Sequence, residues 1–460
     1  MPGDISTDYD AVVVGAGFSG LAAALSLHDA GAKVAVVEAR DRVGGRVETH
    51  DLGGGAWIDL GGTWAGPVQD RILAMAQRFD VALFEQYADG KNVLDLGGKL
   101  RPYSGTIPRV GLGPLLDMGR LQWSAGRAAK RVDAVEPWNS PKAEYLDAIT
   151  LADWLRNHHY GAVATALLAI AGRTTWGAEP REMSMLYVLS YIASAGGLSA
   201  LLDTEGGNQH WRFQGGAARV AEGMAAALPN GSLRLEQPVD SITTDAGGVT
   251  VTGQGPDGTW ELRASRVIVA MPSPLRSRIT FSPSLSPTAA AGSSGWRMGN
   301  LTKCFAIYDE PFWRKDGFTG EALTDAAPNG LTFDVSPPDA SCGILVGFAG
   351  GDDARTLEST DAAGRRELVL GGFARLYGDR ASKPEGWVER AWAAQEWSAG
   401  GPVAVAPPGA LMFSQNALRE PADRIHWAGT ETSALRAGFI DGAIRSGERA
   451  AAEVLGFKQS

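Results

Sequence analysis

The chain has 460 residues, of which 44% are hydrophobic, so it is long enough for two or three units with sizeable cores. Its 52 acidic and 42 basic residues give a net charge of -10, which argues against a nucleic-acid-binding surface and against electrostatic attraction to a membrane. The two cysteines, Cys304 and Cys342, are far apart and lack metal-ligand spacing, so we expect neither a disulfide framework nor a metal site.

The hydropathy and charge pattern of the sequence also predicts no targeting segment. No basic stretch followed by an apolar core opens the sequence, so we expect no signal peptide. The longest apolar run, residues 162–172, is about half the length that a membrane-spanning helix requires. We therefore expect a soluble protein in the reducing cytoplasm, with no membrane partner.

The first fifty residues carry a nucleotide-binding pattern. An apolar run at residues 11–14 leads into GAGFSG, which starts at Gly15, and a second apolar run ends on Glu38. This order is typical of a dinucleotide-binding βαβ unit, in which Gly15 permits a tight turn and Gly17 lets the backbone approach a pyrophosphate. Gly20 lets the helix pack close to its strand. Glu38 is placed to accept the ribose hydroxyls and would repel a 2'-phosphate, so the unit predicts FAD or NAD rather than NADP.

The middle of the chain changes from helical to strand periodicity. Apolar spacing predicts a helix over residues 70–81 and a helical cap over about 150–230. From Leu233 a period of two predicts a β-meander of four short strands, SLRLEQPVDSI, GVTVTGQG, GTWELRA and RVIVAMP. The stretch GQGPDG at residues 253–258 also fits GxGxxG, but Pro256 and the Asp-Gly pair predict a hairpin turn. We reject it as a second nucleotide site, which argues against a reductase fed by a nicotinamide cofactor.

A lysine stands out in the next predicted strand, residues 301–313. Alternation places one set of side chains on one face, Leu301, Lys303, Phe305 and Ile307, and the other set on the opposite face, Thr302, Cys304 and Ala306. A lysine is rarely buried without a partner or a task. A lysine that protects an edge strand from aggregation is the alternative, and the pattern alone does not decide between the two.

The C-terminal region returns to an α/β pattern. RIHWAG predicts a strand, TETSALRAG a loop, and the following residues an amphipathic helix with Ile440, Ala443, Ile444, Gly447, Ala451 and Val454 on one side. The dinucleotide-binding fold that begins near residue 9 is thus expected to be completed after residue 420. The basic segment 119–131 is interpreted as a solvated helix face rather than a membrane-binding surface.

Four motifs in the same order resemble the flavin-dependent monoamine oxidase family over nearly the whole chain. They are GAGFSGLAAA with VVEARDRVGGRVET, then DLGGTWAGPVQDRIL, then TKCFAIYDEPFWR, and finally APPGAL with IHWAGTETSALRAGFIDGAIRSGERAA. The resemblance implies an α/β plus α+β fold, with a Rossmann-like FAD-binding domain of the glutathione-reductase type and a mixed-sheet and helical substrate domain. The expected FAD-binding domain comprises residues 1–82, 214–285 and 395–460, and the substrate domain comprises 83–213 and 286–394.

The resemblance also assigns roles to residues around FAD. Val239 is expected to contact the adenine through its backbone, and Ile440 to open the helix that faces the flavin carbonyl. Lys303 matches the family lysine that holds a water near flavin N5, which favours a catalytic role. The implied cofactor-binding residues are Gly15, Gly17, Phe18, Ser19, Gly20, Glu38, Ala39, Arg40, Gly45, Arg46, Gly61, Gly62, Thr63, Trp64, Val239, Trp392, Gly429, Thr430, Glu431, Phe439 and Ile440.

Two positions depart from the family pattern. Mammalian members attach FAD to a cysteine, but Gly401 stands at the matching position, so we predict noncovalent FAD. The next residue supplies one ring of an aromatic cage in the family, and here it is Pro402, facing Phe439. The matching substrate positions are Thr174, Thr175, Leu202, Gln209, Leu331, Pro402 and Phe439, which describe an apolar cavity with one amide.

The implied activity is oxidation of a primary amine, cycloaliphatic or arylalkyl, to an imine and then an aldehyde or ketone, while O2 becomes H2O2. An L-amino acid oxidase would need a cation for the substrate carboxylate, and Arg173 and Arg212 flank pocket segments without matching pocket positions. A putrescine or polyamine oxidase would need an acid for the second ammonium, for which Glu205 and Glu321 are weak candidates. A non-catalytic FAD-binding interaction module would have no reason to place Lys303 on an apolar face. The sequence leaves a homodimer open.

Overall fold

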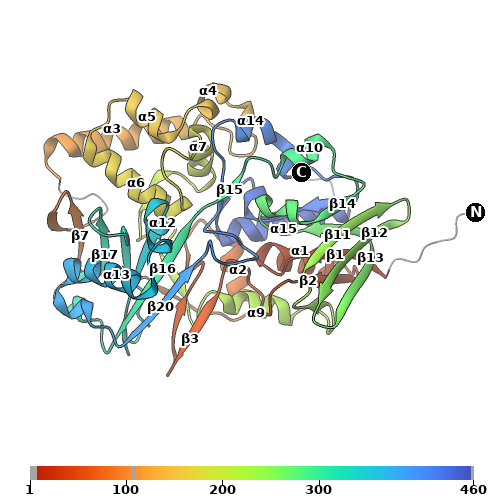
Figure 1. Cartoon of the computed structure of the whole chain (residues 1–460), viewed down its shortest axis with the longest axis horizontal. Coiled ribbons are helices and arrows are strands. Elements are labelled where there is room, and N and C mark those ends of the chain that lie inside the picture. Colours follow the sequence, from red (N-terminus) through yellow and green to blue (C-terminus); the bar gives the residue numbers. More distant parts are fainter. Residues whose placement is uncertain (1–7, 106–109, 457–460) are drawn as a thin grey trace, which may run out of the picture.

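The computed structural model describes residues 8–105 and 110–456, apart from the side chain of Leu202. Two large β-sheets lie toward opposite ends of the molecule in Figure 1, and a group of helices lies above the second sheet. Strands from both ends of the sequence meet in the first sheet, so distant segments build each half of the molecule.

The first sheet has eight strands and a parallel centre. β1 (Tyr9–Val14) pairs in parallel with β2 (Val34–Val37) and with the second half of β13 (Gly258–Val269). The short strand β22 (Ile425–Trp427) pairs in parallel with the same half of β13. The apolar runs of β1 and β2 are buried, as expected for parallel strands covered on both faces. The prediction that the fold is completed after residue 420 is confirmed.

The antiparallel part of this sheet contains the predicted hairpins, with two differences. β11 (Val239–Asp245), β12 (Gly248–Gly255) and β13 pair in sequence, and Gly255 lies opposite Gly258, which confirms that GQGPDG is a hairpin turn. The expected strands GTWELRA and RVIVAMP are one strand, β13, because no glycine or proline separates them. β10 (Leu233–Arg234) leaves the meander and pairs with β2 instead.

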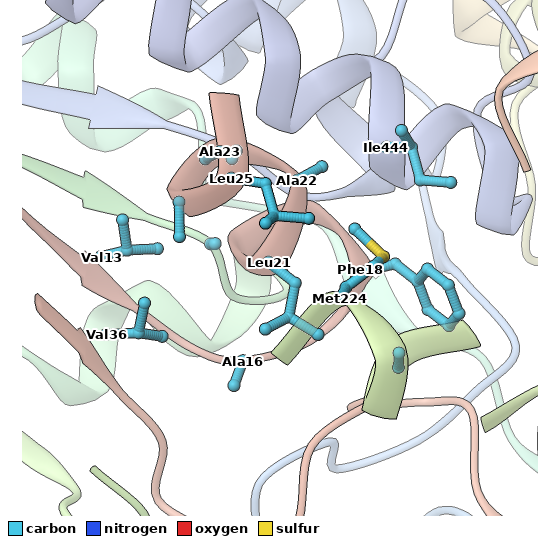
Figure 2. Close-up of a cluster of buried hydrophobic side chains, with 14 of the residues drawn as sticks. Val13, Ala16, Phe18, Leu21, Ala22, Ala23, Leu25, Val36, Met224 and Ile444 are labelled. Carbon is cyan, nitrogen blue, oxygen red and sulfur yellow. The ribbon is translucent and has the colours of Figure 1, made fainter. Parts of the chain in front are cut away.

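Helix α1 (Phe18–Asp29) packs against the C-terminal helix α15 (Ile440–Val454) beside this sheet. A Cβ at Gly447 would lie 2.0 Å from the Ser19 carbonyl oxygen, so glycine allows the two helices to touch. Figure 2 shows how side chains of α1 meet those of β1, β2, α9 (Ala218–Ala226) and α15, including Leu21, Leu25, Val13, Val36, Met224 and Ile444. Of the six residues predicted on the packed side of α15, three are fully buried and three partly buried.

The second sheet has seven strands. In order across the sheet they are β20 (Gly386–Ala391), β16 (Leu301–Tyr308), β19 (Gly343–Gly350), β18 (Leu331–Asp334), β17 (Phe318–Thr324), β7 (Lys91–Leu96) and β8 (Lys99–Tyr103). The predicted strand over residues 301–313 is wrong at its end, since β16 stops at Tyr308 and Pro311, which has no backbone N–H, precedes helix α11 (Phe312–Lys315). β16 has a partner on each side, so Lys303 does not protect a sheet edge.

Helices form the predicted cap over the second sheet (Figure 1). They are α3 (Leu112–Ala129), which contains most of the basic segment, α4 (Ala143–Ala148), α5 (Leu151–Asn157), α6 (Ala162–Trp176), α7 (Met185–Ser194) and α8 (Leu198–Leu202). α9 (Ala218–Ala226) packs on α1 instead. The helix predicted over residues 70–81 is α2 (Asp70–Arg78), which ends before Asp80, a residue with φ of 53°. No helix among the described residues is long and apolar enough to cross a membrane.

Short elements connect the two halves. The remaining strands are β3 (Thr49–Gly53) with β4 (Ala56–Asp59), β5 (Trp64–Ala65) with β9 (Trp211–Phe213) and β6 (Leu83–Glu85), β15 (Arg297–Met298) with β21 (Ala404–Val405), and β14 (Thr280–Ser282) beside β11. The remaining helices are α10 (Pro287–Ala291), α12 (Asp352–Glu358), α13 (Ala362–Tyr377) and α14 (Ala410–Ser414). The large sheets each lie within the ranges expected for one domain, while the β5–β9–β6 sheet crosses between them. The domain boundaries stay a prediction.

Candidate active site

An elongated cavity of about 1060 Å³ connects the two halves of the molecule. It begins at the carboxyl ends of β1 and β2, where ligands of parallel sheets bind, at Val14, Gly15 and Val37. It continues along one face of the second sheet and under helices α3, α6 and α7. The cavity therefore has a nucleotide end formed by the first sheet and a reaction end formed by the second sheet and the helical cap.

Close backbone contacts explain the glycines at the nucleotide end. Gly15 has a φ of 101° and donates its N–H to the Val37 carbonyl oxygen at 2.7 Å. A Cβ at Gly20 would lie 1.9 Å from the Gly15 carbonyl oxygen, so only glycine fits there. At Gly17 the nearest atom to an added Cβ is the Cα of Gly45 at 3.8 Å, and the residue lines the cavity. Gly20 thus serves packing, whereas Gly17 leaves its surface open to a ligand.

Glu38 lies at the end of β2 with its carboxylate held by backbone amides. Its Oε2 accepts from the Ala16 N–H at 2.7 Å, and its Oε1 accepts from the Arg40 N–H at 3.0 Å. The side chain is 4% exposed and lines the cavity. Oε1 also accepts from Arg40 Nη1 at 3.4 Å. The carboxylate is therefore fixed at the place where the sequence motif puts a ribose, and Oε2 keeps a lone pair for a hydroxyl donor.

An ion pair ties the nucleotide end to the C-terminal segment. Arg46 donates from Nη1 to Glu431 Oε1 at 2.6 Å and from Nη2 to Oε2 at 3.0 Å, and Nη1 also donates to the Pro402 carbonyl oxygen. Glu431 also accepts from the Ala404 N–H. Burial raises the pKa of Glu431, but the Arg46 charge and these hydrogen bonds outweigh it and leave the pKa below its usual value. Arg46 lines the cavity, whereas Glu431, also predicted to bind the cofactor, lies behind it.

Lys303 lies on the face of the second sheet that lines the cavity. Its Nζ donates to the carbonyl oxygens of Asp59 at 2.5 Å and Gly61 at 2.9 Å, and to Thr63 Oγ1 at 3.0 Å. The side chain is 2% exposed. Burial lowers the pKa of Lys303 to about 7, although the Asp59 charge opposes the shift and that of Arg212 adds to it. The Lys303 side chain therefore changes between ammonium and neutral amine near neutral pH.

Aromatic and glycine residues surround the region between Lys303 and α15. Trp392 donates its Nε1–H to the Leu60 carbonyl oxygen at 2.8 Å and packs within 3.4 Å of where a Gly401 Cβ would lie. Pro402 and Phe439 both line the cavity, and Phe439 lies next to Tyr191 with their ring centroids 5.8 Å apart. The predicted half-cage is therefore bordered by a tyrosine that the sequence reasoning missed.

The cavity also places the other predicted residues. The predicted substrate positions that line it are Thr174, Thr175, Gln209, Leu331, Pro402 and Phe439, while the Leu202 side chain lies outside the described part of the structure. The predicted cofactor positions that line it are Gly15, Gly17, Phe18, Ser19, Glu38, Ala39, Arg40, Gly45, Arg46, Gly61, Gly62, Thr63, Trp64, Val239, Trp392, Gly429, Thr430, Phe439 and Ile440. Gly20 and Glu431 support this lining from behind.

The polar region at the reaction end is more extensive than expected, since the sequence offered Glu205 and Glu321 only as weak candidates. Glu321 of β17 lines the cavity and accepts a hydrogen bond from Thr204 Oγ1 at 3.1 Å, and Tyr103 and Asn92 line the cavity too. The expectation of an apolar cavity with one amide is therefore incomplete. Glu321 shares a strand face with the apolar Leu323, just as Lys303 shares a face with apolar residues. The alternation of residues along β17 could therefore have identified Glu321 as a candidate.

The geometry fits FAD in shape and chemistry. The nucleotide end has open glycine backbone and a fixed carboxylate, and the first turn of α1 provides amide donors suited to phosphate. The reaction end is mainly apolar, as an aromatic ring system requires. Neither cysteine lines the cavity among the described residues, and no group of described side chains is suited to a metal ion.

Comparisons with known proteins agree with this geometry. The model of flavin containing amine oxidoreductases matches residues 18–455. The putative flavin-containing monoamine oxidase AofH of Mycobacterium tuberculosis is 44% identical over 97% of this chain and 96% of its own length. The structure of putrescine oxidase bound to putrescine has a TM-score of 0.93 at 32% identity, covering 97% of this chain and 99% of that one. Cyclohexylamine oxidase from Brevibacterium oxydans has a TM-score of 0.92 at 32% identity, covering 98% and 99%.

Proposed function

Because the chain belongs to the family of flavin containing amine oxidoreductases, which act on small amines with FAD, we propose that it oxidises a primary amine held between Pro402 and Phe439. The observation that carries the proposal is the position of Lys303, a buried lysine on the cavity wall whose Nζ is fixed by three oxygen atoms. When bound, FAD accepts a hydride equivalent from the amine C–H bond and passes the electrons to O2, giving H2O2. The resulting imine hydrolyses to an aldehyde or ketone.

The cavity wall favours the reactive, neutral form of the amine. An alkylammonium ion has a pKa of about 10.4 in water, so most of the substrate arrives protonated. Transfer into the apolar part of the cavity disfavours the charge and lowers that pKa. Among the described residues, no histidine lines the cavity, and none of the predicted substrate positions is an aspartate or a glutamate. Desolvation rather than a side-chain base therefore prepares the amine.

We assign Lys303 the role of holding positive charge beside the reduced cofactor while O2 accepts electrons. Fixed charge directed at a site where negative charge develops is a strong source of catalysis in a dry cavity. The three oxygen acceptors keep Nζ in place without neutralising it, because none of them is a carboxylate.

Half of the aromatic cage is replaced by Pro402, which favours a wider or branched amine, such as a cycloaliphatic or arylalkyl amine.

We further propose that FAD is bound without a covalent link and that the enzyme works in the cytoplasm. Gly401 stands where a cysteine would be needed, and both cysteines are free thiols. Acid precipitation of the purified holoenzyme tests the attachment. A colourless pellet with a yellow supernatant is the expected result, and a yellow pellet with a colourless supernatant would contradict it.

An L-amino acid oxidase is the main rival, and it needs a cation for the substrate carboxylate. Arg173 pairs with Glu179 and Asp353 outside the cavity, and Arg212 donates to the Ser336 carbonyl oxygen. The cationic side chains that line the cavity among the described residues are Arg40, Arg46, Arg278 and Lys303, and the three arginines already donate to protein oxygens. This arrangement favours an amine over an amino acid.

An anaerobic titration separates these activities. The FAD-loaded protein is mixed without oxygen with cycloaliphatic, arylalkyl, straight-chain and diamine substrates and with L-amino acids, and the flavin absorbance is followed. We expect amines to bleach the flavin and H2O2 to appear when air is admitted. Bleaching by amino acids alone would overturn the proposal, and a protein that stays yellow with every compound would be a non-catalytic FAD-binding module.

A further inference from the structure

Glu321 is a partly buried acid that has no cationic partner among the described residues. It belongs to β17, a strand between β18 and β7 in the interior of the second sheet. Among the described residues, Thr204 is the one hydrogen-bond donor to its carboxylate, and no lysine or arginine forms an ion pair with it. Its accessible surface faces the cavity. An unpaired buried carboxylate is costly, and a cation that enters the cavity would lower that cost.

The register of the sheet places Glu321 relative to Lys303. Lys303 lies opposite Phe348 of β19, Phe348 opposite Leu331 of β18, and Leu331 opposite Leu323 of β17. Glu321 is two residues from Leu323, and both line the cavity, so they lie on the same face of the sheet although the pairing of β17 with β7 is irregular between Phe318 and Ala322. Three strand spacings of about 4.8 Å and two residues along the strand put the Lys303 and Glu321 Cα atoms roughly 16 Å apart.

The surface between the two charges is apolar. Phe348, Leu331 and Leu323 form the row from Lys303 toward Glu321, and all three line the cavity. At the far end, Tyr103 of β8 and Tyr377 of α13 lie close enough for the Glu321 charge to raise the pKa of each phenol, after the larger effect of burial. Both phenols therefore stay neutral, and the other acids that line the cavity near Glu321 are Asp203 and Glu205, on either side of the Thr204 donor.

We propose that Glu321 is a second binding site within the cavity, which holds a cationic nitrogen at the far end of a long substrate whose oxidised end lies between Pro402 and Phe439. The inference rests on the proposed function, because the other end of the substrate is the amine that is oxidised. A fully extended chain advances roughly 1.2 Å per bond, as a backbone does over three bonds per residue. Allowing for contact at each end, two nitrogens separated by about eight to ten bonds fit this spacing, whereas a four-carbon diamine is too short.

The test is a comparison of diaminobutane, diaminohexane and diaminooctane with octylamine, in the FAD-loaded wild type and in Glu321→Gln. Octylamine matches diaminooctane in length and lacks the second charge. We expect the wild type to have a lower KM for diaminooctane than for octylamine or diaminobutane. Glu321→Gln should raise the KM for diaminooctane about tenfold or more, because a charge-assisted hydrogen bond is lost, and leave kcat and the octylamine KM nearly unchanged.

Glu205→Gln is the matched control. Glu205 also lines the cavity, but it is exposed, so its removal tests whether general negative charge near the cavity attracts diamines. A KM increase for diaminooctane in Glu205→Gln equal to that in Glu321→Gln would overturn the assignment. Equal KM values for diaminooctane and octylamine in the wild type would overturn it as well.

A pH series adds a readout that a purely structural role would not affect. Burial raises the pKa of Glu321 to about 7, against a smaller lowering by the Thr204 hydrogen bond. The carboxyl is neutral below this pH and negative above it, so the preference for diaminooctane over octylamine should grow as the pH rises through about 7. The reacting amine titrates similarly in both compounds, so their KM ratio isolates Glu321. Glu321→Gln should show a flat ratio, and a wild-type ratio that is also flat would contradict the proposal.

A binding measurement separates failure of this inference from failure of the proposed function. The melting temperature of the FAD-loaded protein is measured without oxygen in the presence of each compound, since a ligand that binds the folded state raises it. We expect diaminooctane to stabilise the wild type more than Glu321→Gln, whether or not turnover occurs. Oxidation of octylamine with no extra stabilisation by diaminooctane would overturn the second site alone, whereas binding without oxidation of any amine would overturn the proposed function alone.

Discussion

The two ends of the cavity use polar groups in different ways. At the nucleotide end, the Glu38 carboxylate is held by two backbone N–H groups, and Arg46 is matched by Glu431. At the reaction end, Lys303 is held by neutral oxygens, and Glu321 is held by a single hydroxyl. At the nucleotide end, the protein itself therefore supplies the hydrogen-bond and ion-pair partners of the charged groups. The reaction end keeps unpaired charges whose protonation changes near neutral pH, which suits chemistry and substrate selection.

The largest effect is expected from Gly20→Ala at the nucleotide end. The added Cβ would lie 1.9 Å from the Gly15 carbonyl oxygen, so α1 must move away from β1. We expect the variant to yield no stable flavoprotein, because overpacking against backbone costs more than the roughly 1–3 kcal/mol typical of side-chain crowding. Circular dichroism, thermal unfolding and the flavin-to-protein absorbance ratio measure the outcome. A variant with wild-type stability would show that the helix tolerates this contact.

The next largest effect is expected from Glu431→Gln, which breaks the ion pair with Arg46 at the nucleotide end. Arg46 would keep its charge without a carboxylate partner, which costs about 3–5 kcal/mol for a buried pair. Denaturant unfolding at pH 7 measures this loss. Because the folded-state pKa of Glu431 is lowered, the wild type has the full contribution above the ordinary glutamate pKa and loses it as the pH falls through the folded pKa. The difference between the two proteins should therefore shrink in acid, and a constant difference would contradict the ion-pair explanation.

Lys303→Met should act on chemistry at the reaction end. We expect the reoxidation of reduced flavin by O2 to slow about 100-fold, the loss typical of removing one charge-stabilising group. Stopped-flow absorbance of the pre-reduced protein mixed with O2 measures the rate.

The pH dependence of the wild type sharpens this prediction. Since the pKa of Lys303 is about 7, the ammonium is present below that pH and lost above it, so reoxidation should slow as the pH rises. Lys303→Met should show no such slope. Unchanged rates of flavin reduction and reoxidation in the variant would remove Lys303 from the mechanism.

The smallest effect is expected from Gly17→Ala, the counterpart of the Gly20 substitution. The new methyl group would lie 3.8 Å from the nearest protein atom, the Gly45 Cα, so the apoprotein should unfold within about 0.5 kcal/mol of the wild type. The methyl group instead occupies the surface that approaches the pyrophosphate, and flavin affinity should fall about tenfold, which corresponds to about 1.4 kcal/mol. Flavin content after dialysis measures the change. A loss of apoprotein stability comparable to that of Gly20→Ala would remove the distinction between the two glycines.

The nucleotide end was predictable because its signals are local. The strand, turn and helix around Gly15, Gly17 and Gly20, and the acid at Glu38, lie within one βαβ unit whose geometry is set by neighbouring residues. The GQGPDG turn was predictable for the same reason. One error was also local, since the strand from Leu301 was expected to continue to residue 313, although Pro311 ends it. The other error was long-range, because β10 was assigned to the meander although its partner is β2, near the start of the chain.

The reaction end was only partly predictable. Alternation showed that Lys303 shares a face with apolar residues, but the choice between an edge lysine and a buried one depended on β20 pairing with β16. Glu321 was a weak candidate because its position relative to Lys303 depends on three strand registers and on strands far apart in the sequence. The place of Glu431 behind Arg46, rather than on the cavity wall, was likewise decided by long-range packing.

The sequence by itself determined that a dinucleotide lies along α1, and its resemblance to a known family indicated FAD and an amine. Those inferences rest on short-range geometry and on motifs that are read residue by residue. The tertiary structure alone decided which charges are buried without an opposite charge. Burial and pairing depend on which distant segments share a sheet face, and the second sheet brings Lys303 and Glu321 onto one wall of the cavity, separated by an apolar row.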